Sequence, residues 1–148
     1  MNLSQIGVIG TSKKEDERRV PIHPDHLIRL PQHVRTKLIF ETGYGVPFDI
    51  SDEDIAARSG GIASRKSILS DIGSVIIAKP VLSDLKEMKA GGMIWGYPHC
   101  EQQQEITQTA IDRKLTLIAF EDMFVWTPTG AMGRHTFYKN NEMAGYAL

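Results

Sequence analysis

The sequence predicts an α/β fold, with an open, mainly parallel sheet flanked by helices on both faces. Short apolar runs alternate with segments of helical periodicity along the chain. The run at 74–78 is β-branched and continuous, as expected of an interior strand that is covered on both faces. A chain of 148 residues with 41% hydrophobic content is long enough to bury one core. These features together indicate a Rossmann-like arrangement of three layers.

Five strands are expected, each a short apolar run. They cover residues 5–10, 37–41, 74–78, 93–96 and 115–120. Helices are expected from 24 to 30, from 51 to the glycines at 60–61, from 82 to 88 and from 101 to 114. The first begins at a proline and the second at a serine followed by acids, both of which favour a helix start. In the last, Ile106, Ala110 and Ile111 are expected to face inward.

The overall composition excludes several classes of partner. The 17 basic and 18 acidic residues give a net charge of −1, which provides no large basic surface for nucleic acid or anionic lipid. No apolar run approaches the roughly 20 residues that span a bilayer, and the N-terminus lacks a signal pattern. A single cysteine, Cys100, excludes an internal disulfide. We therefore expect a cytoplasmic protein that binds small molecules, with neither nucleic acid nor membrane as a partner.

Three side chains suited to an oxo acid follow predicted strands. Arg19 lies in the loop after the first strand, Lys79 ends the strand at 74–78, and His99 follows the strand at 93–96. Ligands of open α/β sheets bind beyond the carboxyl ends of strands, so we expect one shared crevice. Guanidinium can bind a carboxylate, ammonium can polarise a carbonyl, and imidazole can transfer protons near neutral pH. Together they suit carbinolamine and imine chemistry.

Each of these residues also has an ordinary structural interpretation. Arg19 lies in a charged run typical of solvated loops, Lys79 fits a surface lysine at a strand end, and His99 fits a helix cap.

Spacing excludes other kinds of site. Gly43 and Gly45 begin a dinucleotide fingerprint but lack its third glycine. No residue pattern indicates a metal site, because Cys100 has no second thiol to join it. Glu121 and Asp122 are expected in an extended segment, where neighbours face opposite sides and cannot form a carboxylate pair.

Several motifs resemble the N-terminal domain of the alanine dehydrogenase and transhydrogenase superfamily. Arg19, Val20 and Pro24 match an arginine, a valine and a proline of that family, and 41–45 resembles its acid-x-glycine-x-glycine loop. A narrower likeness, to carboxyethyl-ornithine synthase in the opine-type branch near the saccharopine dehydrogenases, is carried by 96–99 and 130–145.

The resemblance implies the substrate half of an NAD(P)H-dependent reductive-amination oxidoreductase. Such an enzyme condenses pyruvate, or a related 2-oxo acid, with the side-chain amine of ornithine or lysine and reduces the imine. It implies that Arg19 holds the carboxylate while Lys79 and His99 act on the carbonyl oxygen and protons. Arg134 and Glu142 are further candidates for contact with the second substrate.

The resemblance also implies a missing partner domain. Residues 1–138 are predicted to form the substrate domain, and 139–148 to begin an interdomain helix leading to a nucleotide-binding domain that the sequence lacks. NADP or NAD would bind to that domain, or to a complementary chain, so the chain alone is expected to be inactive. A homo-oligomer is compatible with this prediction, and no metal is expected.

Two alternatives stay open. One is an alanine dehydrogenase-type domain that uses ammonia. The other is a non-catalytic module that binds a 2-oxo acid or a protein partner through an exposed apolar patch. The residues expected in that patch are Phe124, Trp126, Met132, Phe137 and Tyr138.

Overall fold

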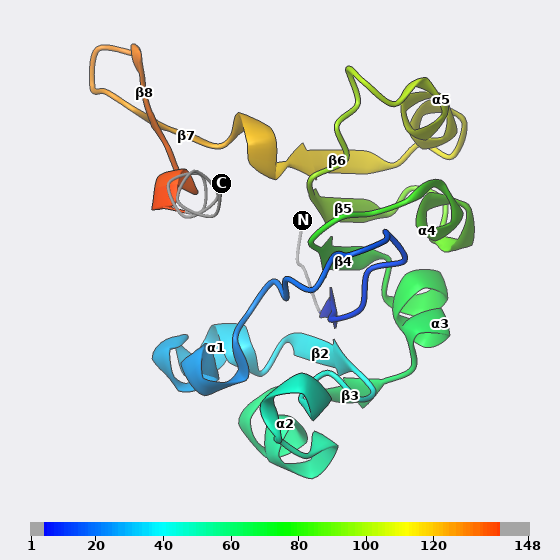
Figure 1. The fold of residues 1–148 in the computed structure, drawn as a ribbon, viewed down its shortest axis with the longest axis vertical. Helices are drawn as coiled ribbons and strands as arrows, with labels where there is room; N and C mark the ends of the chain where they lie inside the picture. Colours follow the sequence, from blue (N-terminus) through cyan, green and yellow to red (C-terminus); the bar gives the residue numbers. More distant parts are fainter. Residues whose placement is uncertain (1–4, 140–148) are drawn as a thin grey trace.

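The computed structural model, which describes residues 5–139, contains a six-stranded sheet in the order β3-β2-β1-β4-β5-β6 (Figure 1). Every neighbouring pair of strands in this sheet is parallel. The strands are β1 (Ile6–Ile9), β2 (Leu38–Glu41), β3 (Gly61–Ala63), β4 (Ser74–Ile77), β5 (Met93–Gly96) and β6 (Thr116–Ala119). The predicted α/β fold with an open parallel sheet is confirmed.

Helical segments connect these strands. The α-helices are α1 (Gln32–Arg35), α2 (Asp52–Arg58), α3 (Arg65–Ser67), α4 (Leu82–Glu87) and α5 (Gln104–Asp112). Short 3₁₀ turns form η1 (Pro24–Arg29), η2 (Val46–Phe48) and η4 (Phe120–Asp122), and a π-helical turn, η3 (Ile68–Ile72), continues α3. None of the helices within residues 5–139 is long and apolar enough to cross a membrane.

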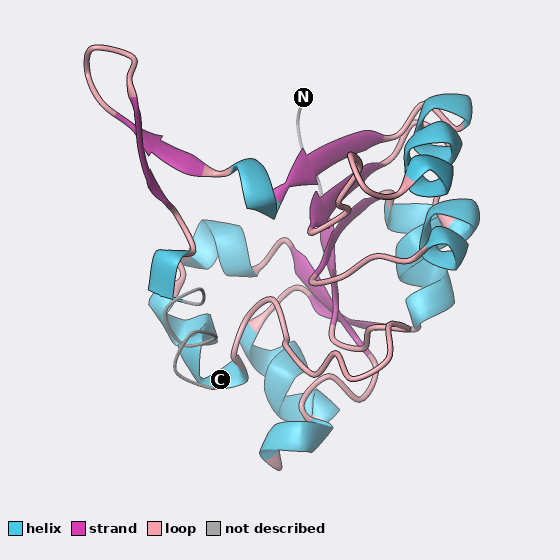
Figure 2. Cartoon of the chain, turned by 45° about the horizontal axis from the view of Figure 1, so that its top comes forward, coloured by secondary structure: helices cyan, strands magenta, loops and turns pink. Residues whose placement is uncertain are grey.

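Two apolar cores lie on opposite faces of the sheet, which gives three layers (Figure 2). Successive strand residues point to opposite faces, so Val8 joins one core and Ile9 the other. The core around Ile9 packs against α4 and α5 through Leu85 and Ile106. The core around Val8 packs against η1 and α2, and draws its strand residues from β1, β2 and β3.

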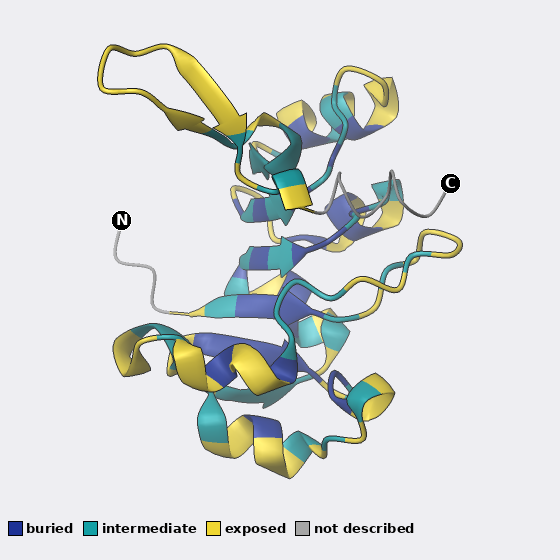
Figure 3. Ribbon diagram, turned by 60° about the vertical axis from the view of Figure 1, so that its left-hand side comes forward, coloured by how far each residue is buried: buried dark blue, intermediate teal, exposed yellow. Residues whose placement is uncertain are grey.

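A two-stranded antiparallel hairpin, β7 (Phe124–Trp126) with β8 (Met132–His135), projects from the end of the main sheet (Figures 1 and 3). Trp126 and Met132 are 60% and 63% exposed, as the predicted apolar patch requires. Phe137 instead packs against Phe120, with ring centroids 5.1 Å apart. The helix expected from 139 onward lies, but for its first residue, outside the described residues.

Three expectations about local structure were wrong. Strand β3 was not foreseen, because it is only three residues long and begins at the second of the two glycines that were expected to end a helix. Ile111 is 64% exposed, because it lies well around α5 from the buried pair Ile106 and Ala110. Glu121 lies in the turn η4 and not in an extended segment, so its side chain and that of Asp122 line the same cavity.

Candidate functional site

The order of the strands reverses between β1 and β4, and the carboxyl ends of these two strands are the expected ligand-binding edge of the sheet. The chain runs from β1 to β2 and β3 on one side, then returns to pair β4 with the other side of β1. In open parallel sheets, ligands bind beyond the carboxyl ends of the strands at such a reversal. The loop that carries Arg19 follows β1, and Lys79 follows β4, so both emerge at this edge.

Lys79 and His99 contact each other directly. They follow the paired strands β4 and β5, in which Ile76 lies opposite Trp95. The Lys79 Nζ lies 3.1 Å from the His99 Nε2. When the Lys79 ammonium donates this hydrogen bond, Nε2 is the acceptor and the neutral imidazole carries its proton on Nδ1.

Arg19 joins this pair around the ring of Tyr97. The Arg19 guanidinium carbon and the Lys79 Nζ each lie 5.8 Å from the centre of that ring, and the His99 ring lies roughly parallel to it with centroids 6.0 Å apart. The structure therefore brings together the three side chains that the sequence indicated.

Glu17 pairs with one edge of the Arg19 guanidinium. Arg19 Nε donates to Glu17 Oε1 at 2.8 Å, and Nη2 donates to Oε2 at 2.5 Å. These hydrogen bonds are the main reason that the pKa of Glu17 is lowered, and its side chain is only 6% exposed. The pair uses Nε and Nη2 and does not engage the Nη1 side of the guanidinium.

The environment of Lys79 disfavours its charged form. Burial is the largest cause of its lowered pKa, and the cationic Lys14 and Arg19 lower it further, whereas Glu17 acts in the opposite direction. A lysine with a lowered pKa exchanges protons more readily near neutral pH.

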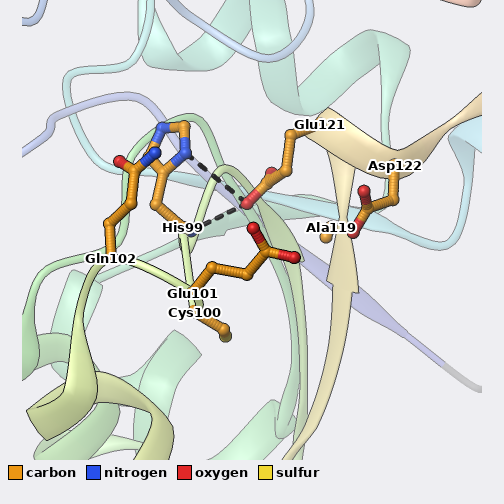
Figure 4. A pocket seen from close by; sticks show the side chains of 7 residues that line it. All are labelled: His99, Cys100, Glu101, Gln102, Ala119, Glu121 and Asp122. Atoms are coloured by element: carbon orange, nitrogen blue, oxygen red, sulfur yellow. Dashed lines mark hydrogen bonds and ion pairs between the residues drawn. The ribbon is translucent and has the colours of Figure 1, made fainter.

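His99 is held in a constrained backbone conformation. Its φ of 48° is left-handed, which is uncommon for residues other than glycine. Its backbone N–H donates to Glu121 Oε1 at 2.7 Å, and its Nδ1 lies 3.7 Å from the same oxygen (Figure 4). Glu121 therefore orients the loop and faces the ring nitrogen that lies away from Lys79.

Two cavities flank His99. One, of about 660 Å³, is lined by Lys14, Lys79, Pro80, Val81, Tyr97, His99, Gln102 and Gln103. The other, of about 250 Å³, has three carboxylates in its wall, from Glu101, Glu121 and Asp122 (Figure 4). One side of His99 is thus lined with cations and the other with anions.

A buried cluster of charges ties the site loops to the sheet. Arg65 Nη2 donates to Asp84 at 2.8 Å, and Arg65 Nη1 lies 3.3 Å from Glu41 and 2.7 Å from the Thr11 carbonyl oxygen. Glu41 accepts from the backbone N–H groups of Gly10 and Thr11. The start of the Arg19 loop is therefore fixed to the end of β2 and to α4.

The other two predicted site residues do not join this group. Arg134 lies on β8 with its guanidinium carbon 3.7 Å from the centre of the Tyr138 ring, and it lines a separate hollow in the hairpin with Trp126. Glu142 lies outside the described residues. Within residues 5–139, no three His, Cys, Asp or Glu side chains are grouped so as to hold a metal ion.

Sequence reasoning missed four residues that line or adjoin the cavities, namely Lys14, Glu17, Tyr97 and Glu121. Two of them had a usable signal. Glu121 follows β6 at the same carboxyl edge as Lys79 and His99, and Tyr97 directly follows β5. Nothing in the sequence indicated that Lys14, in a run of charged residues, would be the lysine that lines the cavity.

Comparison with known proteins identifies the family of this chain. Residues 8–131 match the model of the alanine dehydrogenase/PNT N-terminal domain. The chain belongs to this family. It is 28% identical over 109 residues to an alanine dehydrogenase of Staphylococcus haemolyticus (strain JCSC1435), and 29% identical over 109 residues to alanine dehydrogenase 2 of Staphylococcus aureus (strain USA300).

These matches cover 73% of the chain but only 29% of each relative, so the chain spans less than a third of their length. Among solved structures, an L-alanine dehydrogenase superposes with a TM-score of 0.67 and 25% identity, over 86% of this chain and 34% of that one. A transhydrogenase from Sinorhizobium meliloti superposes with a TM-score of 0.65 over 80% of this chain and 35% of that one, and its 14% identity supports the shared fold alone.

Proposed function

We propose that this chain is the substrate-binding half of an NAD(P)H-dependent oxidoreductase that aminates pyruvate or a related 2-oxo acid. The observation that carries this proposal is the placement of Arg19, Lys79 and His99 around Tyr97. The family membership supports it, since the named relatives are alanine dehydrogenases.

In this proposal the substrate carboxylate binds the Nη1 side of Arg19, while Glu17 keeps the opposite edge. An arginine can bind two carboxylates at once because its five N–H donors lie along two edges. The Glu17 pair fixes the direction of the guanidinium before substrate arrives, which lowers the ordering cost of binding.

Lys79 and His99 would handle the protons. As the amine attacks the carbonyl carbon, a C–N bond forms, the oxygen takes up a proton and the nitrogen releases one, which gives the carbinolamine. A second proton on the oxygen lets the C–O bond break and water leave, and the nitrogen releases its second proton to yield the imine. The Lys79 ammonium is the proton donor to the oxygen. His99 takes up a proton that the nitrogen releases and, as the imidazolium, passes one from Nε2 to Lys79 through the 3.1 Å contact. Glu121, 3.7 Å from Nδ1, stabilises the imidazolium form of His99 as a positioning residue.

Reduction of the imine needs a hydride, which NADH or NADPH supplies when bound. We propose that a nucleotide-binding domain outside residues 1–148 holds it, with 139–148 leading there and 1–138 as the substrate domain. Glu142 stays a prediction for contact with the second substrate. Arg134 also stays a prediction for this contact. Because it lies on the hairpin, it could contact only an amine substrate that extends away from Lys79.

The amine donor we favour is the side-chain amine of ornithine or lysine, as in carboxyethyl-ornithine synthase. The 250 Å³ cavity beside His99 supports this choice, because its carboxylates suit the second ammonium group of a diamino acid. An alanine dehydrogenase-type reaction with ammonia is the alternative, favoured by the names of the relatives. A binding-only module is the third, favoured by the exposed hairpin residues Trp126 and Met132.

Titration of the isolated chain with pyruvate, followed by ¹H–¹⁵N NMR, tests the pocket. We expect shifts centred on Arg19, Lys79, Tyr97 and His99. Arg19→Met should raise Kd about 10- to 100-fold, since hydrogen bonds to charged groups contribute about 1.5–3 kcal/mol. Arg18→Met, which removes the adjacent exposed arginine, is the matched control. Shifts elsewhere, or equal effects of both variants, would contradict the proposal.

A second assay separates the donors. The chain is combined with the nucleotide-binding half of an alanine dehydrogenase, and oxidation of NADH or NADPH is followed with pyruvate plus ornithine, lysine or ammonia. A rate dependent on ornithine or lysine supports the opine-type reaction, and a rate dependent on ammonia supports the alternative.

A further inference from the structure

The larger cavity holds more positive charge than one carboxylate can neutralise. Lys14 and Lys79 both line it, and no carboxylate is among its described lining residues. Arg19, whose charge also acts on Lys79, lines a smaller cavity that shares Tyr97 with it. Among the described residues, the charged groups that act on Lys79 are the cations Lys14 and Arg19 and one carboxylate, Glu17. Three cations against one carboxylate leave two positive charges, whereas pyruvate carries one negative charge.

Lys14 is held beside Lys79 by the backbone. The Ser12 hydroxyl donates to the Lys79 carbonyl oxygen at 2.9 Å and accepts from the Lys14 N–H at 3.1 Å. One hydroxyl group therefore joins the main chains of the two lysines. The closeness of the two backbones is therefore built into the loop.

The neighbouring lysine shows the contrast. The Lys13 Nζ lies 2.9 Å from Glu87 and 3.4 Å from Asp84, so its charge is matched by carboxylates of α4. Lys14 instead faces the cavity that Lys79 lines. Two adjacent lysines thus have different roles, the first joining the loop to α4 and the second supplying an unmatched charge.

The volume of the cavity also leaves room for a second carboxylate group. At about 660 Å³ it offers far more space than the six heavy atoms of pyruvate fill. Part of its wall is polar, with Gln102 and Gln103 beside His99, so a larger ligand would meet hydrogen-bonding groups there.

We propose that Lys14 binds a second carboxylate, so that the occupied site holds two carboxylate groups, one at Arg19 and one at Lys14 in the larger cavity. This inference rests on the proposed function. The second carboxylate comes either from a dicarboxylic 2-oxo acid or from an amino acid that binds together with a monocarboxylic one.

The first arm of the test compares two acids of the same chain length by calorimetric titration of the chain. 2-Oxoglutarate has a terminal carboxylate where 2-oxopentanoate has a methyl group. If the oxo acid supplies the second carboxylate, 2-oxoglutarate binds about tenfold more tightly, the gain expected of one charge-assisted hydrogen bond. Lys14→Gln should abolish that preference, and the control Lys13→Gln should keep it.

The second arm measures pyruvate binding in the presence of ornithine or of 1,4-diaminobutane, which is ornithine without its carboxylate. If the amino acid supplies the second carboxylate, ornithine tightens pyruvate binding about tenfold more than the diamine does. Lys14→Gln again removes the difference and Lys13→Gln does not.

A preference in either arm that depends on Lys14 supports the inference and identifies the source. Equal binding in both arms, or a preference that Lys14→Gln leaves intact, overturns it. Pyruvate binding that depends on Arg19 while both arms show no Lys14 effect overturns this inference alone. Failure of pyruvate to bind in an Arg19-dependent way overturns the proposed function instead.

Discussion

Two clusters of charged side chains lie at the carboxyl edge of the sheet and differ in how their charges are matched. In the buried cluster, Arg65 contacts both Glu41 and Asp84, and the Asp84 side chain is fully buried. In the cavity cluster, Lys79 is acted on by two other cations, Lys14 and Arg19, but among the described residues by one carboxylate, Glu17, which is itself paired with Arg19. Cations that directly contact carboxylates indicate a structural role here, whereas cations in excess of carboxylates at a cavity indicate a ligand of opposite sign.

The largest expected effect comes from breaking the buried cluster. Arg65→Met leaves Glu41 and Asp84 without their guanidinium, and removing one partner of a buried ion pair costs about 3–5 kcal/mol. Urea unfolding would measure this loss of stability. Lys66→Met, which removes the adjacent exposed cation, should change the free energy of unfolding by less than about 0.5 kcal/mol. A loss below about 1 kcal/mol for Arg65→Met would show that the buried cluster is no more stabilising than an exposed pair.

An intermediate effect is expected at the far end of the Arg19 loop. The Tyr44 hydroxyl donates to the Ile22 carbonyl oxygen at 2.7 Å and accepts from the Ile22 N–H at 3.1 Å. Burial raises the pKa of Tyr44, so the hydroxyl stays protonated. Tyr44→Phe leaves both backbone groups without that partner and should destabilise the chain by about 1–3 kcal/mol in the same unfolding assay. An unchanged midpoint would mean that water replaces the hydroxyl.

The pKa of Lys79 should change with each charge that is removed from the cavity cluster. Lys14→Gln removes a cation and should raise the pKa of Lys79, whereas Glu17→Gln removes the carboxylate and should lower it further. ¹³C NMR of reductively methylated lysines measures this, with the Lys79 signal assigned from Lys79→Arg. Shifts of the same sign in both variants would contradict the arrangement described.

The same shift gives the stability of the chain a pH dependence. Because Lys79 has a folded pKa below its ordinary 10.5, the unfolded chain binds more protons between the two values, so stability rises with pH through that window. Unfolding of the parent and of Lys79→Met from neutral pH to 10.5 should show a rise in the parent that the variant lacks.

The smallest expected effect is the stability of Lys14→Gln. Removing one cation from a group of three relieves repulsion, so at low salt the variant should be more stable by less than about 0.5 kcal/mol. In 0.5 M NaCl the difference should vanish, because salt screens exposed charges. A clear loss of stability would instead show that Lys14 has a structural role like that of the buried cluster.

The parallel fold was predictable because its signals are local. The apolar runs of β1, β2, β4, β5 and β6 have the composition of buried strands, and all five form strands in the sheet. β3 was missed because Gly61–Ala63 is too short to show a pattern. The hairpin was missed because its strands, Phe124–Trp126 and Met132–His135, are short and pair with each other away from the core. Without a buried face, their sequences do not show the alternation of apolar and polar residues that indicates a strand.

The site residues that directly follow strands could be predicted from the sequence. Lys79 and His99 follow adjacent strands, so a general rule for parallel sheets brings them together. Arg19 reaches the same place through a loop, and its partner Glu17 and neighbour Lys14 are set by that loop's turns, which composition does not encode. Arg134 was selected by resemblance alone, and the structure places it on the hairpin.

The hydrogen-bonded pairing of β4 with β5 makes Lys79 and His99 a unit of fixed spacing, since separating them would require strand pairing to break. Arg19 has no such restriction, because it sits midway along a connection of fourteen residues between Ile9 and Pro24. Insertions or deletions after Ser12 would therefore move the carboxylate-binding side relative to an unchanged proton-transfer pair. A change in the length of the loop at 13–23 would therefore alter the range of acids that the site accepts without a change in the sheet.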